Sequence, residues 1–374
     1  MKIGLLTFHC AQNFGAVLQC YATQEFLKNK GYDVEVIDYR PDYLLRPYRL
    51  FNVQRLACGN PIKSGINLVK ELIQFPRRCY RQWAYRKFAN KYLTLSDTVT
   101  KESIPPYYDT YLVGSDQIWN PRLTKGFDDA YFCRFKFPKD NKRYVAYAAS
   151  MEVKELSAED KQYYQEVLSR FDAVSVREDE LARLLQPLTS QPVTQVLDPT
   201  LMADPQIWDA FSTRSSFSKK KYVVIYQGRS NKASERIAKD IAKQVGGEVY
   251  ILSTWFSLSR GETHMNISPE QFVDIIRNAA CVITTSFHGT AFSIIFNRPF
   301  YTIRMNDGAD TRSQSLLASL NLQDRMIGTD ASPLFSAIDY SEANVKLEQL
   351  RSRSQQFLLD ALQGTEGNFL KSDC

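Results

Sequence analysis

The chain has 374 residues with a formal net charge of +6, and 44% of its residues are hydrophobic and 24% are charged. These values are ordinary for a globular protein, so a disordered or collagen-like chain is excluded. At roughly 150 residues per domain, the length indicates two or three domains. No stretch approaches ~18 consecutive apolar residues, and residues 1–7 lack the long apolar run of a signal peptide. We therefore expect a cytosolic protein without a membrane span.

Cysteine and histidine are few and scattered. The seven cysteines, at positions 10, 20, 58, 79, 133, 281 and 374, form no CxxC pair, which argues against a disulfide scaffold or a zinc knuckle. We expect reduced and mostly buried thiols. The three histidines, His9, His264 and His288, are too few for a multi-histidine centre, and we expect no metal. For His264, in an irregular segment, a surface role is expected.

Positive charge is concentrated in residues 40–91, which contain twelve Lys or Arg and only two acidic residues, Asp42 and Glu71. Three interpretations compete: a solvated helix face, a surface attracted to anionic lipid or to a lipid-linked anionic acceptor, and a nucleic-acid surface. Nucleic acid is the weakest, because no recognised nucleic-acid motif accompanies the segment. Pro76 predicts that any helix through this region is broken or kinked.

In chain order, the first half alternates short apolar strands with helical patterns. Residues 2–7 and 33–38 are predicted strands, and the segment between them has helical periodicity. Strand, helix and strand in this order form a βαβ unit, which predicts a parallel sheet. The pattern continues with predicted strands at 111–113, 144–147 and 173–176 and a predicted helix near 157–169.

A second series of the same kind follows a proline-rich stretch, residues 187–205, that marks a crossing between domains. Its predicted strands are 222–225, 248–252, 281–284 and 299–303, and its predicted helices are 233–244, 268–278 and 288–297. A last helical pattern, 341–362, has no following strand, and we expect it to pack back on the first domain.

The sequence therefore predicts two Rossmann-like, doubly wound α/β domains that face a cleft. The first domain is expected to cover residues 1–186, with the basic segment 40–91 inserted in it. The second is expected to cover residues 187–340. Residues 341–374 then form a C-terminal helix and tail.

In open α/β sheets, ligands bind beyond the carboxyl ends of the strands, where loops lead into the following helices. Four such loops are unusually polar here. The first, residues 9–15, contains Asn13 and Gly15, which suit a tight turn into a helix whose amides can bind an anion. Ordinary helix capping is the alternative. His9, in the same loop, is expected to line the floor of the cleft.

The second loop, residues 114–121, places Ser115, Asp116 and Gln117 directly after an apolar strand. One carboxylate with several hydrogen-bonding groups suits the hydroxyls of a sugar. The alternative is that Asp116 caps a helix.

The third loop begins with Arg177, which leaves the end of the predicted strand 173–176. Its planar guanidinium can bind a phosphate or a carboxylate through two parallel hydrogen bonds. A salt bridge to Glu178 or Asp179 is the alternative.

The fourth loop, residues 284–290, gives the strongest signal. His288 lies at the predicted start of a helix, beside Gly289 and the hydroxyls of Ser286 and Thr290. Helix amides and hydroxyls favour a bound phosphate or carboxylate, and the histidine can exchange a proton beside it. A structural capping histidine is the alternative.

Together, these motifs resemble the polysaccharide pyruvyl transferase family. The matching segments are residues 7–19 (TFHCAQNFGAVLQ), 114–120 (GSDQIWN), 175–178 (SVRE) and 285–290 (TSFHGT). The resemblance implies two Rossmann-like domains arranged as in GT-B glycosyltransferases. It also implies transfer of a pyruvyl group from phosphoenolpyruvate to two hydroxyls of a sugar in a surface or capsular polysaccharide precursor, which gives a cyclic ketal. In the family, the arginine of the third loop and the histidine of the fourth hold phosphoenolpyruvate, and these positions are Arg177 and His288 here.

The expected site divides into two sides. We expect His288 to act as the acid or to assist the departure of phosphate, and Asp116 to orient or deprotonate the acceptor. The expected donor side is Arg177, Ser286, Phe287, His288, Gly289, Thr290 and Arg312, and the expected acceptor side is His9, Asn13, Ser115, Asp116 and Gln117.

One position departs from the family pattern. Better-known members carry an arginine two residues before the histidine of the fourth loop, where this chain has Ser286. A cation for the donor is therefore missing or comes from elsewhere. We expect Arg312, just before a predicted helix at 316–320, to replace it, with Arg304 as the second candidate.

Two other classes of function stay open. A GT-B glycosyltransferase would bind the ribose and diphosphate of a nucleotide sugar, for which no acidic signature is obvious. A non-catalytic glycan-binding protein of polysaccharide assembly has no need for the polar residues concentrated in four loops. We expect no cofactor, no nucleic-acid partner, and a sugar acceptor that is a lipid-linked glycan. The location is then cytoplasmic, at the inner face of the membrane through residues 40–91.

Overall fold

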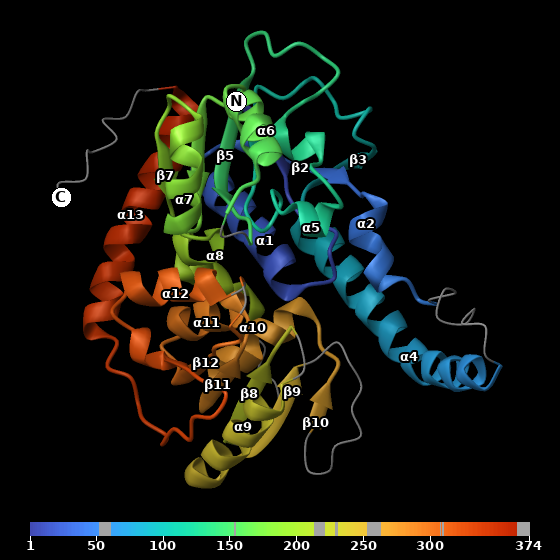
Figure 1. Cartoon of the computed structure of the whole chain (residues 1–374), viewed down its shortest axis with the longest axis vertical. Helices are drawn as coiled ribbons and strands as arrows, with labels where there is room; N and C mark the ends of the chain where they lie inside the picture. Colours follow the sequence, from blue (N-terminus) through green and yellow to red (C-terminus); the bar gives the residue numbers. More distant parts are fainter. Residues whose placement is uncertain are drawn as a thin grey trace.

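The computed structural model describes residues 1–51, 61–152, 155–212, 221–228, 231–252, 263–306, 308 and 310–364, with the backbone alone at 61, 62, 263 and 264. Its strands form two parallel sheets, each flanked by helices, in two domains that lie end to end (Figure 1). The predicted fold class, two doubly wound α/β domains, is confirmed. Cys58, Cys374 and the side chain of His264 lie outside the described residues.

The first sheet has seven parallel strands in the order β3-β2-β1-β4-β5-β6-β7. Its inner strands are buried along almost their whole length, because helices cover both faces and leave no solvated side. The strands are β1 (Lys2–Leu6), β2 (Asp33–Tyr39), β3 (Leu95–Val99), β4 (Thr110–Val113), β5 (Arg143–Ala149), β6 (Ala173–Val176) and β7 (Val193–Gln195). The helices are α1 (Phe14–Asn29), α2 (Asp42–Leu45), η1 (Arg46–Tyr48), α4 (Pro61–Tyr92), α5 (Pro121–Thr124), η2 (Asp129–Phe132), α6 (Ala158–Leu168), α7 (Asp179–Leu185) and η3 (Gln186–Leu188).

The second sheet has six parallel strands in the order β10-β9-β8-β11-β12-β13. They are β8 (Tyr222–Tyr226), β9 (Glu248–Leu252), β10 (Thr263–Met265), β11 (Cys281–Thr284), β12 (Phe300–Ile303) and β13 (Met326–Ile327). The helices around it are α9 (Lys232–Val245), α10 (Pro269–Asn278), α11 (Phe287–Ile295), α12 (Asp310–Ser319) and η6 (Gln323–Arg325). Two short elements, α8 (Pro199–Met202) and η4 (Pro205–Phe211), connect the sheets, and α13 (Ser341–Gln363) ends the described chain.

The differences from the predicted elements lie at the sheet edges. The strands β3, β7, β10 and β13 were not predicted, and β7, β10 and β13 have only two or three residues each. Such segments are too short for a periodic pattern to identify them. Because β7 pairs with β6, the first sheet continues beyond the boundary predicted at residue 186.

Helix α4 continues through Pro76, which lies inside it. Proline has no amide hydrogen to donate to the preceding turn, so it bends a helix more often than it ends one when packing holds both sides. Figure 1 shows α4 changing direction along its length as its outer half extends away from the body of the molecule. Its second half is anchored to the body of the molecule, with Ala84, Tyr85 and Phe88 buried.

Aromatic packing joins the two domains beside the loops of interest. The ring of Phe14, the first residue of α1, stacks on Phe272 of α10 with ring centroids 4.6 Å apart. It also lies 5.6 Å from the ring of Tyr85 in α4 and 5.9 Å from that of Tyr226 in β8. One hydrophobic core cluster therefore includes residues of both domains.

The C-terminal helix returns to the first domain, as predicted. Arg351 and Gln355 of α13 donate hydrogen bonds to the carbonyls of Leu201 and Met202 in α8. The hydroxyl of Ser354 accepts a hydrogen bond from the amide of Leu197 at 2.9 Å. These contacts fix the position of α8 and of the residue that precedes it, Asp198.

Candidate functional site

The carboxyl ends of the two sheets meet at the loops that the sequence singled out. His288 is the second residue of α11, directly after β11, and Gly15 lies at the start of α1, after β1. A Cβ atom placed on Gly15 would lie 2.0 Å from Nδ1 of His288. The imidazole of the second domain therefore lies directly against the backbone of the first.

Asp198 connects the loops through a single buried carboxylate. Its Oδ2 accepts hydrogen bonds from Nη1 of Arg177 at 2.7 Å and from the hydroxyl of Ser115 at 3.2 Å, and it lies 3.6 Å from Nε2 of His288. Its Oδ1 accepts hydrogen bonds from the amide and the hydroxyl of Thr200, so Asp198 is the N-cap residue of α8. One carboxylate thus holds groups from both domains within about 4 Å of one oxygen.

The charge of Asp198 is stabilised by these neighbours. Burial alone would raise the pKa of this carboxyl, but the imidazole of His288 and the guanidinium of Arg177 hold it well below its usual range. Asp198 is 1% exposed. A buried carboxylate without such partners would be strongly destabilising, so the pairing is a requirement of the fold.

The predicted convergence of Arg177 and His288 is therefore observed, with Asp198 between them. The guanidinium of Arg177 lies over the ring of Phe287, 4.8 Å from its centroid. Its Nη1 is paired, but within the described residues its Nε and Nη2 are buried without a hydrogen-bond acceptor. The same is true of Nε2 of His288. Buried donors in native proteins are nearly always satisfied, so these atoms indicate a place for an acceptor-rich ligand.

Arg312 joins this cluster from the other domain. It lies in the first turn of α12, so the prediction that it precedes the helix was wrong, although the residue itself reaches the site. With the Gln117 amide oxygen turned toward it, Nη1 and Nη2 donate to that oxygen at 2.9 and 3.0 Å. Burial, and then repulsion from Arg177, lowers the pKa of Arg312. Its Nε is also buried without a partner in the described part of the chain. Arg304, the second candidate, is exposed.

The other residues expected on the donor side have mainly backbone roles. A Cβ on Gly289 would lie 2.2 Å from Oγ1 of Thr284, so only glycine allows α11 to approach β11 this closely. The hydroxyl of Thr290 hydrogen-bonds to that of Thr302 at 2.7 Å and is buried. Ser286 is the N-cap residue of α11 and makes no side-chain capping bond.

Asp116 is the partly accessible carboxylate of the site. Its side chain is 14% exposed, and its Oδ1 lies 3.8 Å from Nη2 of Arg177. It adopts a φ of +71°, which turns the loop sharply after β4, and its Oδ1 accepts a hydrogen bond from the amide of Gln117 at 2.9 Å. It does not cap a helix, because Asn120 caps α5. Asp116 is thus placed to meet a ligand that approaches Arg177.

Two residues expected on the acceptor side instead have partners within the first domain. His9 is 2% exposed, and its Nε2 lies 2.8 Å from Oδ1 of Asp38. The side chain of Asn13 accepts a hydrogen bond from the amide of Ala16 and so caps α1. These contacts support structural roles for both residues. For Asn13, this role is the helix-capping alternative given in the sequence analysis.

Sequence reasoning missed two residues that organise the site. Asp198 was passed over because it lies in the proline-rich stretch, although an aspartate directly before Pro199 is a typical start of a helix. Gln19 was quoted only as part of a motif. Its Nε2 donates to the hydroxyl of Thr7 at 2.8 Å, and its Oε1 accepts from the amide of Ser115 at 3.3 Å, which ties the first loop to the second.

Metal binding has no visible basis here: across the described residues, no three His, Cys, Asp or Glu side chains are grouped to hold a metal ion. The buried donor atoms of the site that lack a hydrogen-bond partner among the described residues belong to Arg177, Arg312 and His288. They suit a phosphate or carboxylate ligand directly.

Comparison with known proteins agrees with the motifs. The family model for polysaccharide pyruvyl transferases matches residues 13–307, which include the second, third and fourth loops and the last three residues of the first. The chain belongs to the polysaccharide pyruvyl transferase family. The match also spans Asp198, so the residue that connects the two domains lies inside the region that the family model matches.

Solved structures with a similar course of the chain are enzymes of nucleotide-sugar metabolism. A UDP-GlcNAc 2-epimerase from Methanocaldococcus jannaschii is 11% identical, with a TM-score of 0.47 and coverage of 97% of this chain and 100% of that one. The same values apply to a UDP-GlcNAc 2-epimerase from Neisseria meningitidis. The spinosyn rhamnosyltransferase SpnG is 12% identical, with a TM-score of 0.42 and the same coverage. No curated protein sequence matches the chain.

We predict that Asp198→Asn lowers the free energy of unfolding of the protein by about 3–5 kcal/mol, because it removes the carboxylate that is hydrogen-bonded to the buried guanidinium of Arg177 and leaves the more distant Glu178 and Asp116. Urea denaturation measures the change. Because the folded pKa of Asp198 is depressed, the difference between variant and wild type should persist at neutral pH and shrink as the pH falls below about 4. The matched control is Asp209→Asn, whose ion pair with Arg277 is largely exposed and should be worth at most about 1 kcal/mol.

We predict that Gly15→Ala displaces His288, because the added methyl group would overlap Nδ1 of the imidazole. A shift of this size at a catalytic group costs about 10²-fold in turnover. Steady-state kinetics measure the loss. Gly65→Ala, at an α4 position with open space around it, is the control and should retain full activity. Equal activity of the two variants would contradict the placement of His288.

Proposed function

We propose that this protein transfers the pyruvyl group of phosphoenolpyruvate onto two hydroxyls of a sugar in a polysaccharide precursor, forming a cyclic ketal. Membership of the pyruvyl transferase family supports a pyruvyl donor and a sugar acceptor. The observation that carries the choice of donor is the set of buried donor atoms without acceptors, on Arg177, Arg312 and His288. Phosphoenolpyruvate brings a phosphate and a carboxylate, the two groups that satisfy such atoms.

The proposed donor site uses the guanidinium nitrogens of Arg177 and Arg312 that are buried without a hydrogen-bond partner among the described residues. Asp198 is hydrogen-bonded to Nη1 of Arg177. Nε and Nη2 form ion pairs with Glu178 and Asp116 at 3.6 and 3.8 Å, as the salt-bridge alternative for Glu178 predicted, but within the described part of the chain neither nitrogen makes a hydrogen bond, and we propose that both bind an oxyanion. Burial raises the pKa of the neighbouring Glu178 carboxyl, which weakens its hold on the same guanidinium. We propose that Arg312 supplies a second cation in place of the arginine that other members carry at the position of Ser286. Arg177 and Arg312 would then provide two positive charges for the phosphate and the carboxylate of the donor.

In the proposed reaction, a proton is added to the methylene carbon of the donor, and C2 becomes electrophilic. One sugar hydroxyl adds to C2, the bond from C2 to the phosphate oxygen breaks, and the second hydroxyl adds to close the ketal. Of the two hydroxyl protons, one balances the proton taken up by the methyl group and the other leaves with phosphate. His288 is placed to deliver the proton or to assist phosphate departure, with Asp198 3.6 Å from its Nε2 as the positioning residue.

Asp116 is the proposed base or orienting group for the acceptor. It is the accessible carboxylate beside Arg177, so a sugar hydroxyl can reach it while the donor occupies the guanidinium. We further propose that the acceptor is a glycan carried on a lipid, with the basic residues 40–91 turned to the inner face of the membrane. No helix among the described residues is both long enough and apolar enough to cross a bilayer.

The proposal predicts that phosphoenolpyruvate binds and that His288 acts on it. Phosphoenolpyruvate at 100 times its dissociation constant should stabilise the fold by about 2.7 kcal/mol, and nucleotide sugars should not. In the presence of an accepted glycan, mass spectrometry should detect the increment of a pyruvate ketal and released phosphate. His288→Ala should lower that rate by about 10²–10⁴. Because the imidazole also stabilises the buried carboxylate of Asp198, the rate is measured at a temperature at which circular dichroism shows the variant to be folded. Stabilisation by a nucleotide sugar alone would indicate a glycosyltransferase instead.

The role of Arg312 has its own test. If Arg312 replaces the arginine that other members carry at the position of Ser286, Arg312→Ala should weaken phosphoenolpyruvate binding, and adding Ser286→Arg should partly restore it. The apparent Michaelis constant for phosphoenolpyruvate measures both effects. No restoration in the double variant would count against the replacement.

A further inference from the structure

The outer half of α4 exposes an unusual number of large apolar side chains. Ile66, Leu68, Val69, Leu72 and Ile73 are 51%, 44%, 56%, 55% and 55% exposed. At 3.6 residues per turn they fall on one side of the helix. A contiguous exposed apolar surface of this kind marks a place where another molecule binds.

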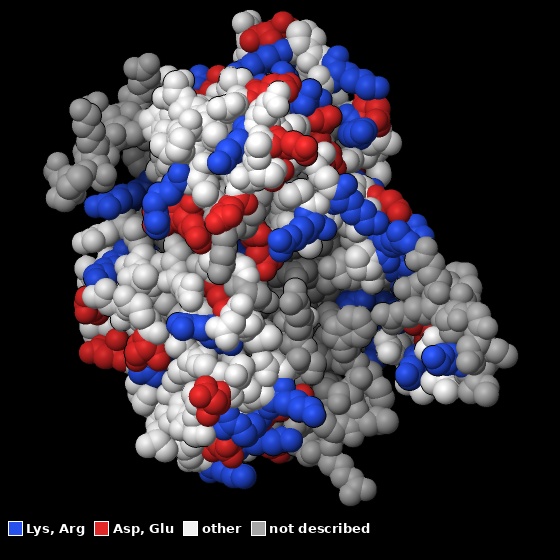
Figure 2. Space-filling view, viewed as in Figure 1, with Lys and Arg blue, Asp and Glu red and all other residues white. Residues whose placement is uncertain are grey.

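The rest of the same helix is strongly basic. Residues 61–92 contain eight Lys or Arg and one acidic residue, Glu71, which is buried and paired with Arg78. Lys70 and Arg77 lie at the border of the apolar residues, each four residues after Ile66 and Ile73. Figure 2 shows basic side chains over α4 where the helix leaves the body of the molecule. Basic side chains beside an apolar stripe can keep their charges at the headgroups while the stripe enters the lipid, as in a helix that lies in the plane of a membrane interface.

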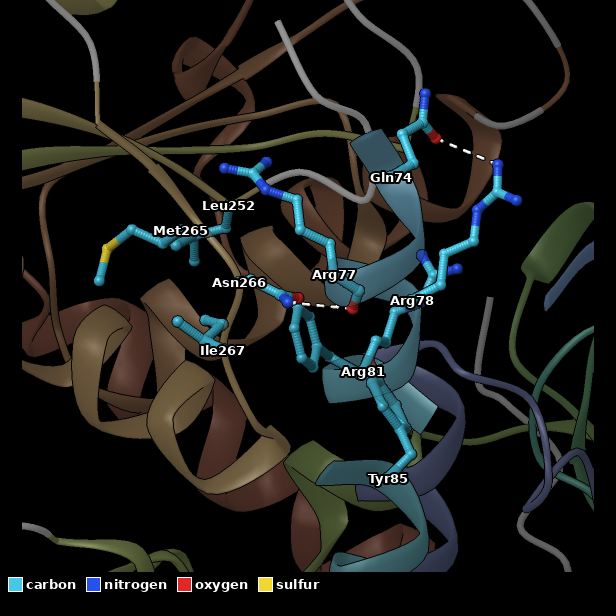
Figure 3. Close-up of a pocket in the computed structure, with 10 residues that line it drawn as sticks. Gln74, Arg77, Arg78, Arg81, Tyr85, Leu252, Met265, Asn266 and Ile267 are labelled. Carbon is cyan, nitrogen blue, oxygen red and sulfur yellow. Dashed lines mark hydrogen bonds between the residues drawn. The ribbon is translucent and has the colours of Figure 1, made fainter. Parts of the chain in front are cut away.

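A basic recess lies at the base of this helix. Arg77, Arg78 and Arg81 line it on the α4 side, facing Met265 and Asn266 of the second domain (Figure 3). The carbonyl of Arg77 accepts a hydrogen bond from Nδ2 of Asn266 at 3.0 Å. The described lining of the recess contains three guanidinium groups and no carboxylate. This charge suits a phosphate group.

The recess is close to the site already described. Phe14 lines it and is the neighbour in sequence of Gly15, which lies against His288. Arg81 donates from Nε to the side chain of Gln12 in the same loop at 3.0 Å. If the phosphate group of a molecule lies in the recess, the group attached to that phosphate therefore lies near the first loop of the site.

We propose that α4 docks this protein on an anionic membrane, with its apolar stripe among the lipid chains and the arginine recess on a lipid phosphate. The occupant is an anionic bilayer rather than a protein, because the apolar stripe and the excess of basic residues occur on one helix and complement the two layers of a bilayer surface. Trp83, further along α4, is 54% exposed, and tryptophan is favoured at the level of lipid headgroups. Docking does not depend on the proposed reaction, but it would bring a lipid-carried acceptor to the site.

Vesicle co-sedimentation of the full chain tests the docking. Wild type should bind vesicles of phosphatidylcholine and phosphatidylglycerol at least tenfold more tightly than vesicles of phosphatidylcholine alone. The triple variant Val69→Gln, Leu72→Gln, Ile73→Gln should lose at least tenfold of that affinity. The matched control is the double variant Leu334→Gln, Val345→Gln. Both residues lie outside α4, near or in α13, and are 78% and 59% exposed. This variant should bind vesicles as wild type does.

A variant that removes positive charges tests the electrostatic contribution to membrane binding. Lys70→Gln with Arg77→Gln should weaken binding to the anionic vesicles by about fivefold per residue and leave the weak binding to neutral vesicles unchanged. Lys243→Gln on α9, 80% exposed, is the control. The proposal would be overturned if wild type did not bind anionic vesicles, or if the triple variant bound them as tightly as wild type. Light scattering that shows a dimer dissociated by the triple variant, with vesicle binding intact, would assign α4 to self-association and also overturn it.

Docking and catalysis can fail separately. The triple variant changes only exposed residues outside the site, so it should convert a water-soluble acceptor at the wild-type rate. It should be slower only on an acceptor embedded in vesicles. A protein that binds vesicles but forms no ketal would contradict the proposed reaction and leave the docking intact.

Discussion

The structure depends on one buried carboxylate that must be neutralised. Asp198 lies where the chain crosses between the two sheets, and its charge is tolerable only because Arg177, Ser115 and His288 surround it. Those partners follow β6, β4 and β11, so satisfying one charge fixes three loops and both domains. Because α13 holds α8 in place, the C-terminal helix also contributes to the geometry of a site that it does not touch.

The same arrangement leaves the site ready for an anion. Asp198 satisfies one nitrogen of Arg177 and leaves two, while Arg312 adds a second guanidinium whose pKa is lowered by burial and by its neighbour. Two close cations repel one another, and the carboxylates of Asp198, Glu178 and Asp116 offset part of this repulsion. A bound phosphate or carboxylate would offset more of it. An enzyme that must hold an acidic donor while protonating it benefits from cations that are already fixed in position.

Most of the fold could be predicted from the sequence, because inner strands of parallel sheets are continuous apolar runs and α9 and α10 have clear capping and periodicity. The edge strands β7, β10 and β13 could not, since two or three residues carry no period. Arg177 and His288 were predicted because each ends an apolar strand or begins a helix. Asp198 was not, because its role depends on contacts with residues 21 and 90 positions away. His9 looked like a site residue for its chemistry, but its partner is Asp38 of the adjacent strand.

The central claim is that an anionic donor lies between Arg177, Arg312 and His288. A crystal structure of the protein soaked with phosphoenolpyruvate tests it most directly. The account predicts electron density for the donor with its phosphate or carboxylate oxygens within hydrogen-bond distance of Nε or Nη2 of Arg177 and with its methylene carbon on the side of His288. Density for phosphoenolpyruvate bound only elsewhere, with the nitrogens of Arg177 still without an acceptor, would contradict it.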